Sequence, residues 1–94
     1  MAINITFSDD ISGNEAPLTN IDENMALETL FNKLEENGFG PFSKLDSQGA
    51  LVVEPANGDP ITHPWNPDFL KYPLVKLDVS DGCTLKVAKQ NKVA

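Results

Sequence analysis

The sequence predicts an α+β domain in which one amphipathic helix packs on a mixed sheet of four or five strands. The first observation is a single stretch with helical periodicity, in which four apolar side chains fall on one side of a helix: Leu27, Leu30, Phe31 and Leu34. The second is a set of short stretches in which apolar and polar residues alternate, as in strands with one buried face. A helix and a sheet with one apolar face each can enclose a core, and 94 residues suffice for a single domain over residues 1–94.

The first strand is expected over Ile3–Phe7, where Ile and Phe alternate with Asn and Thr. The next stretch, Asp9–Ala16, contains Ser-Gly-Asn, which is typical of a turn or loop. We expect Pro17–Thr19 to form a short returning strand before the helix.

The helix is expected over Asp22–Asn37. Asn20, with Glu23 three residues later, matches a capping box, and Asp22 offers a second N-terminal cap. Gly38 marks the end of the helix, since glycine adopts the left-handed conformation after a helix at little cost.

A further strand is expected over Ala50–Glu54, and Asn57-Gly58 predicts a tight turn that returns the chain toward Ile61. The Pro-rich stretch of residues 55–73 is expected to be irregular, because proline breaks helices and central strands. A single turn is expected within it, over Asp68–Lys71.

The last element is expected to be a hairpin over residues 75–87, followed by a frayed tail over residues 89–94. A three-residue loop, Ser80–Gly82, pairs Val79 with Cys83 and keeps one face of this hairpin wholly apolar. Gly82 then takes a left-handed bulge position. The whole scheme predicts fourteen inward side chains: Ile3, Ile5, Phe7, Leu27, Leu30, Phe31, Leu34, Leu51, Val53, Val75, Leu77, Val79, Leu85 and Val87.

The composition disfavours nucleic-acid-binding, membrane and secreted proteins. The formal net charge is −7 and no residue is arginine, which disfavours nucleic-acid binding, because arginine supplies the fork that reads phosphate and guanine. No segment is long and apolar enough to span a membrane, so no membrane partner is expected. The opening Met-Ala-Ile-Asn-Ile does not look like a signal peptide, and a lone cysteine forms no intrachain disulfide, so we expect a cytoplasmic protein.

The order of these elements resembles the ubiquitin-like β-grasp superfamily. The parts that look like its first strand, its capped helix, and its following strand and turn are Ile3–Ser8, Thr19–Gly38 and Leu51–Gly58. Either Leu77–Val79 or Leu85–Val87 would be the closing strand. The sequence ends Lys92-Val93-Ala94, without the Gly-Gly tail of conjugated and sulfur-carrying members, so the resemblance implies a non-enzymatic binding module.

Catalysis, cofactors and metals are not expected. Cys83, His63 and an aspartate could be written as nucleophile, base and acid, but Cys83 falls on the predicted buried face and fits a small core residue better. The acidic loop that begins at Asp9 lacks the bidentate Glu at the twelfth position of a calcium loop. A single histidine excludes the usual zinc ligand sets.

Two function classes remain. The first is a protein-binding module, an adaptor or small subunit of a larger complex, that contacts its partner through four residues of the Pro-rich stretch: His63, Trp65, Phe69 and Tyr72. Trp65 could instead cover one end of the core. The second class is an acidic inhibitor of immunity or phage type, which blocks a basic site on its target through an acidic surface: Asp9, Asp10, Glu28, Glu35 and Glu36.

Overall fold

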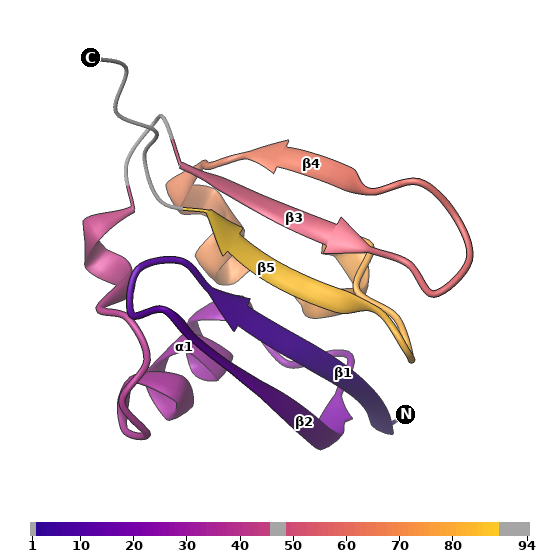
Figure 1. Cartoon of the computed structure of the whole chain (residues 1–94), viewed down its shortest axis with the longest axis horizontal. Coiled ribbons are helices and arrows are strands. Elements are labelled where there is room, and N and C mark those ends of the chain that lie inside the picture. The colour runs from indigo at the N-terminus through magenta and orange to yellow at the C-terminus, as the bar shows by residue number, and fades with distance from the viewer. Residues whose placement is uncertain (1, 46–48, 89–94) are drawn as a thin grey trace.

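The computed structural model describes residues 2–45 and 49–88, and it confirms the expected fold class of one helix on a mixed sheet (Figure 1). The tail expected over residues 89–94 lies outside the described residues. The described elements, where η marks a short 3₁₀ helix, are β1 Ala2–Asp9, β2 Asn14–Asp22, α1 Leu27–Glu35, η1 Phe42–Lys44, β3 Ala50–Glu54, β4 Ile61–Pro64, η2 Pro67–Lys71, η3 Leu74–Leu77 and β5 Thr84–Ala88.

The sheet has five strands in the order β2-β1-β5-β3-β4. β1 and β5 run parallel, and the other neighbours are antiparallel. The last strand in the sequence therefore lies in the middle of the sheet, between the first strand and β3 (Figure 1). Leu85 and Val87 of β5 are fully buried, as expected for a central strand whose side chains meet the helix layer.

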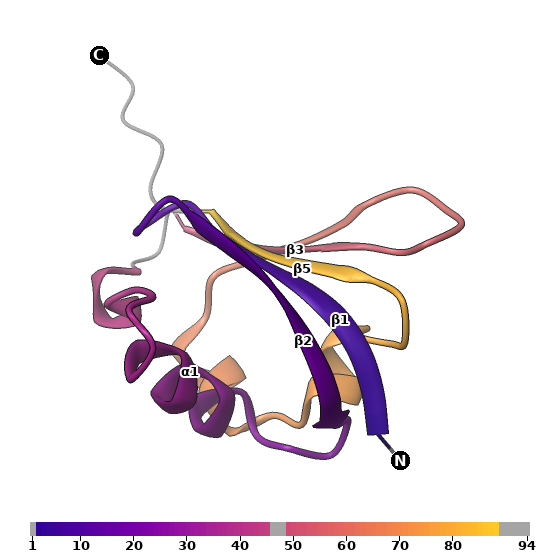
Figure 2. The same cartoon turned by 60° about the horizontal axis from the view of Figure 1, so that its bottom comes forward.

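The helices all lie on one face of the sheet, and the other face is open (Figure 2). The helical stripe is buried as predicted, with Leu27 0% and Leu34 4% exposed. Thirteen of the fourteen predicted inward side chains are buried, and the exception is Val75, which is 47% exposed. The structure adds Phe42, Leu45, Trp65 and Leu74 to the core.

The predicted start of the helix is wrong: α1 begins at Leu27 rather than at Asp22. The segment before it belongs to β2, where Asn20 has a left-handed φ of 59° and Asp22 pairs with Ala2. The capping box is therefore not formed, and Ala26 at the N-cap makes no side-chain cap. A tertiary contact replaces it, because the Leu27 N–H donates to the carbonyl oxygen of Tyr72 at 3.0 Å.

The predicted glycine ending is confirmed, although α1 itself ends at Glu35 rather than at Asn37. Gly38 has φ +94°, and the N–H of Phe39 donates to the carbonyl oxygen of Leu34 at 3.1 Å. This six-to-one bond over a left-handed glycine is a Schellman ending.

The returning strand expected over Pro17–Thr19 is present but longer than predicted, and the turn before it is confined to residues 10–13. β2 runs over Asn14–Asp22 and pairs with β1 along most of its length. Its side chains are polar because it is an edge strand, with one side open to solvent and only partial cover on the other. Alternation of apolar residues is a weak signal on such a strand.

The terminal hairpin was also predicted wrongly, since Leu74–Leu77 is the 3₁₀ helix η3 rather than a strand. Leu74 and Leu77 are buried three residues apart, and Val75 between them points outward. β5 pairs with β1 and β3, so it has no free edge for a hairpin partner. The local features of the prediction are confirmed: Gly82 has φ +85°, and Cys83 is 1% exposed.

The β3–β4 hairpin forms as expected, but its connection is longer than the predicted tight turn. The register pairs Val53 with Ile61, so the chain between them includes two prolines as well as Asn57-Gly58. The predicted turn in the Pro-rich stretch is present as η2, and the Asn66 side chain caps it by accepting from the Asp68 N–H at 2.9 Å.

Candidate functional site

The four residues predicted as a partner-binding loop lie together in one aromatic cluster. Phe69 is its centre, with ring centroids 6.0 Å from those of His63 and Trp65 and 5.8 Å from that of Tyr72. Trp65 is 9% exposed and stacks toward Phe31 of α1, with 6.2 Å between ring centroids. Trp65 is thus part of the core, whereas His63, Phe69 and Tyr72 are half-buried around it.

His63 contacts an acid. Its Nε2 atom lies 3.1 Å from Oδ2 of Asp78, and the two side chains are 23% and 51% exposed. The distance is that of an ion pair, but the alignment does not make a hydrogen bond to this buried Nε2 atom. We therefore interpret the pair as a contact between two polar side chains at the surface, and not as an oriented catalytic dyad.

Cys83 lies at the start of β5 and is buried. Burial raises the pKa of the Cys83 thiol, so the reactive thiolate is scarce at neutral pH. Among the described residues, no group of three or more His, Cys, Asp and Glu side chains is arranged to hold a metal ion.

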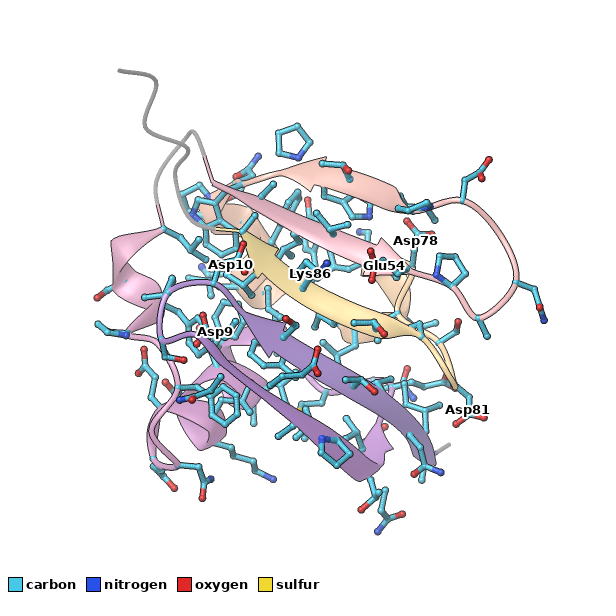
Figure 3. All side chains as sticks on the ribbon, viewed as in Figure 1. Asp9, Asp10, Glu54, Asp78, Asp81 and Lys86 are labelled. Atoms are coloured by element: carbon cyan, nitrogen blue, oxygen red, sulfur yellow. The ribbon has the colours of Figure 1, made fainter. Side chains whose placement is uncertain are left out.

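The predicted acidic surface is only partly assembled. Asp9 is 1% exposed, which contradicts its expected place on that surface. Its carboxylate accepts from the N–H of Ile11 and the hydroxyl of Ser12, both at 2.8 Å, and from the N–H of Gly40 at 2.7 Å. Asp9 therefore joins the β1–β2 turn to the segment after α1 (Figure 3). The other four acids of the set are exposed: Asp10, Glu28, Glu35 and Glu36.

A groove of about 280 Å³ runs beside α1, between the helix and the two 3₁₀ helices η1 and η2. Its lining combines two glutamates, two other polar residues and three apolar ones: Glu28, Glu35, Asn32, Ser43, Phe31, Phe42 and Leu70. Glu28 and Glu35 were predicted as surface acids, whereas the apolar wall was not predicted, because it joins three segments that are far apart in the sequence.

The groove walls are held by specific contacts. The rings of Phe31 and Phe42 stack with centroids 4.1 Å apart at 18°. Oε2 of Glu35 accepts from the N–H of Phe42 at 2.9 Å, which links the helix to η1. Gly40, with φ +79°, permits this packing, because a Cβ there would lie 2.8 Å from the Phe42 nitrogen and 3.3 Å from Cγ of Glu35.

The open face of the sheet is mostly polar. At its centre, Lys86 of β5 lies beside Glu54 of β3, with 3.5 Å between Nζ and Oε2 (Figure 3). Both side chains are more than a third exposed, and a pair of this kind contributes about 0–1 kcal/mol to stability. The face thus lacks the apolar character of the groove.

The β2 edge of the sheet is closed to another strand. The Thr6 N–H donates to the carbonyl oxygen of Cys83 at 3.0 Å. The backbone N–H and C=O groups of even-numbered β1 residues therefore point toward β5, and those of odd-numbered residues point toward β2. Phe7 pairs with Ala16, so the backbone N–H and C=O groups of Ala16 point toward β1. The backbone of its neighbour Pro17 points toward the open edge of the sheet. Proline has no N–H, and the outer edge of β2 therefore lacks a donor in its middle.

The β4 edge is closed in the same way. The Trp65 N–H donates to the carbonyl oxygen of Gly49 at 2.8 Å, so the backbone N–H and C=O groups of odd-numbered residues of this strand point toward β3. Thr62 and Pro64 then face solvent, and Pro64 offers no N–H. Both edges thus disfavour binding by strand addition, in which main-chain hydrogen bonds provide the affinity.

In comparisons with known proteins, neither a protein-family model nor a curated protein matches the sequence. Within the described residues, none of the helices has the length and apolar character needed to cross a membrane.

Proposed function

We propose that this chain is a non-enzymatic protein-binding module of the β-grasp type, an adaptor or small subunit of a larger complex. The observation that carries the proposal is the groove beside α1, which is lined by the apolar residues Phe31, Phe42 and Leu70 together with polar residues of α1 and η1. Its volume of about 280 Å³ is at the lower end of the roughly 300–1,000 Å³ of small-molecule sites, and its lining has few polar groups that converge on one point. A side chain or short segment of another protein therefore fits it better than a cofactor.

Two further features support binding through a surface rather than chemistry. The one thiol is buried and has a raised pKa, and the one histidine faces only an exposed aspartate. The prolines at both sheet edges disfavour strand addition, so the groove is the better contact. A lone buried cysteine, without a disulfide, also supports the cytoplasmic location that is part of this proposal.

The aromatic cluster has a different role in this proposal from the one expected of it. Trp65 and Phe69 support the groove from behind, because Trp65 stacks toward Phe31, which lines the groove. His63 and Tyr72 are half-buried and do not line the groove; His63 contacts Asp78, and the ammonium of Lys76 lies 4.5 Å from the centroid of the Tyr72 ring.

A second candidate function, the acidic inhibitor, is supported by the exposed acids on one helix, Glu28, Glu35 and Glu36. The two functions differ in what binding does to the partner. An inhibitor blocks the partner's basic site, so the partner's activity on its own anionic ligand falls as the complex forms. An adaptor leaves that activity unchanged.

The test is affinity capture from the native host with two matched variants on α1. Asn32→Trp places a large ring in the groove, whereas Thr29→Trp places the same ring at an exposed position of the same helix that does not line the groove. We expect a partner that the unmodified chain and Thr29→Trp capture and that Asn32→Trp loses. Capture of no protein above a bead control, or equal capture by both variants, would refute the groove as the binding site.

A further inference from the structure

We propose that the groove receives an arginine side chain of the partner, with its aliphatic stem on the apolar residues and its guanidinium against Glu35, while Glu28 adds negative charge to the same groove. This inference rests on the proposed function and specifies the partner's chemistry. Three features of the groove support it: the charge of the lining residues, the orientation of Glu35 and the apolar residues in the lining.

The charge of the groove has one sign. Glu28 and Glu35 are seven residues apart on α1, so they lie about two turns, or roughly 10 Å, from one another along the same side of the helix. Asn32 lies between them. None of the residues described as lining the groove is basic. A cation is therefore the complementary ligand, and the net charge of −7 attracts it from a distance.

The Glu35 carboxylate is oriented before any ligand arrives. Oε2 accepts a hydrogen bond from the Phe42 N–H at 2.9 Å. Cγ of Glu35 lies close to Gly40, where a Cβ atom would be only 3.3 Å away from it. Among the described residues no donor bonds to Oε1, and Glu35 is exposed, so a ligand can donate to this second oxygen. A carboxylate held in this way loses less side-chain entropy on binding than a free surface glutamate.

The apolar residues of the groove favour arginine over a small cation. The rings of Phe31 and Phe42 stack with centroids 4.1 Å apart, so each ring covers one face of the other. The two residues are 3% and 5% exposed, which leaves little ring face for a cation. What they offer with Leu70 is apolar contact for a long aliphatic stem. Arginine combines such a stem with a planar fork that pairs with a carboxylate, and it is more weakly hydrated than lysine.

The experiment titrates the full ¹⁵N-labelled chain with N-acetyl-arginine methylamide and follows its amide signals. The matched ligand is N-acetyl-citrulline methylamide, which has nearly the same shape without the charge. We expect the arginine ligand to shift amides of the groove residues on α1 and η1, and the citrulline ligand to shift them much less. Equal shifts with both ligands, or arginine shifts scattered over the surface, would overturn the proposal.

The matched variants are Glu35→Gln and Glu36→Gln, which change the net charge equally on adjacent residues, only one of which lines the groove. Glu35→Gln should weaken the arginine ligand about two- to fivefold, the range of a single exposed ion pair, and Glu36→Gln should leave it nearly unchanged. Equal weakening by both would show diffuse attraction only and would refute the site. The same spectra report that each variant is folded.

The outcome for arginine is separable from the outcome for protein binding. If Asn32→Trp abolishes capture of a partner but the arginine ligand causes no localised shifts, the groove binds protein and the inference about its cationic ligand is wrong. If the arginine ligand binds at the groove but no partner is captured, the ligand chemistry stands and the protein-binding function fails.

Discussion

The replacement Trp65→Ala decides between the two roles expected for this side chain. The indole is 9% exposed and lies between Phe31, at 6.2 Å, and Phe69, at 6.0 Å between ring centroids. Removing it opens a cavity between α1 and η2 and deletes one stacked and one edge-on aromatic contact. Truncation of a buried Trp to Ala costs about 3–5 kcal/mol.

That cost is a large part of the total stability of a domain of this size, which is roughly 5–15 kcal/mol. At about 4–8 °C per kcal/mol, the melting temperature should fall by roughly 12 °C or more. The measurement is urea unfolding followed by far-ultraviolet circular dichroism, because the variant has no tryptophan to report. Trp65→Phe is the control, since it keeps an aromatic ring in the cavity and should lose less.

A small loss of stability in Trp65→Ala would contradict the burial of the indole. If Trp65→Ala unfolds within about 1 kcal/mol of the unmodified chain, the indole is not part of the core and the packing described above is wrong. In that case Trp65 would again be a contact residue of the partner-binding loop. A red-shifted emission from the native protein would point the same way, because a buried indole emits at shorter wavelength.

Three further replacements or reactions test the local structure. Asp9→Ala should destabilise the fold by about 2–5 kcal/mol, measured in urea, because it leaves the half-buried N–H groups of Ile11 and Gly40 without the carboxylate that accepts from them; an unchanged midpoint would contradict the anchoring role. Gly82→Val should lower the melting temperature, since φ +85° strains a β-branched residue, and a matched Ser80→Val should not. Cys83 should react slowly with a thiol reagent at pH 7 and faster as pH rises, because burial raises its pKa; rapid labelling of the folded chain would disprove its burial.

What the sequence predicts well is decided locally. The four-residue apolar stripe of α1, its glycine ending at Gly38 and the alternation in β1 and β3 all depend on residues within a few positions of one another. The same holds for Gly82, whose left-handed conformation follows from a turn of small residues. These features agree with the structure because no distant partner can change them.

What the sequence predicts badly depends on distant partners. β2 extends over Asn14–Asp22 because β1 pairs with it, although its own residues predict only a short strand over Pro17–Thr19, between a loop and a helix cap. Leu74–Leu77 leaves the sheet because β5 is already paired on both sides, by β1 and β3. Asp9 was expected on the surface because aspartate usually is, and its burial needs donors from Ile11, Ser12 and Gly40, the last of them 31 residues away. The groove was missed for the same reason.

The contacts that stabilise the fold also shape the groove, and this decides which substitutions can test it. The Asp9 carboxylate accepts a hydrogen bond from the Gly40 N–H. Because Gly40 has no Cβ, the Glu35 side chain can pass close to it, and the Glu35 carboxylate accepts from the Phe42 N–H. Glu35→Ala would therefore remove a structural acceptor together with a charge, and lost binding could not be assigned to either. Glu35→Gln keeps an oxygen that can accept from the Phe42 N–H and removes only the charge, so it separates recognition of a cation from support of the wall.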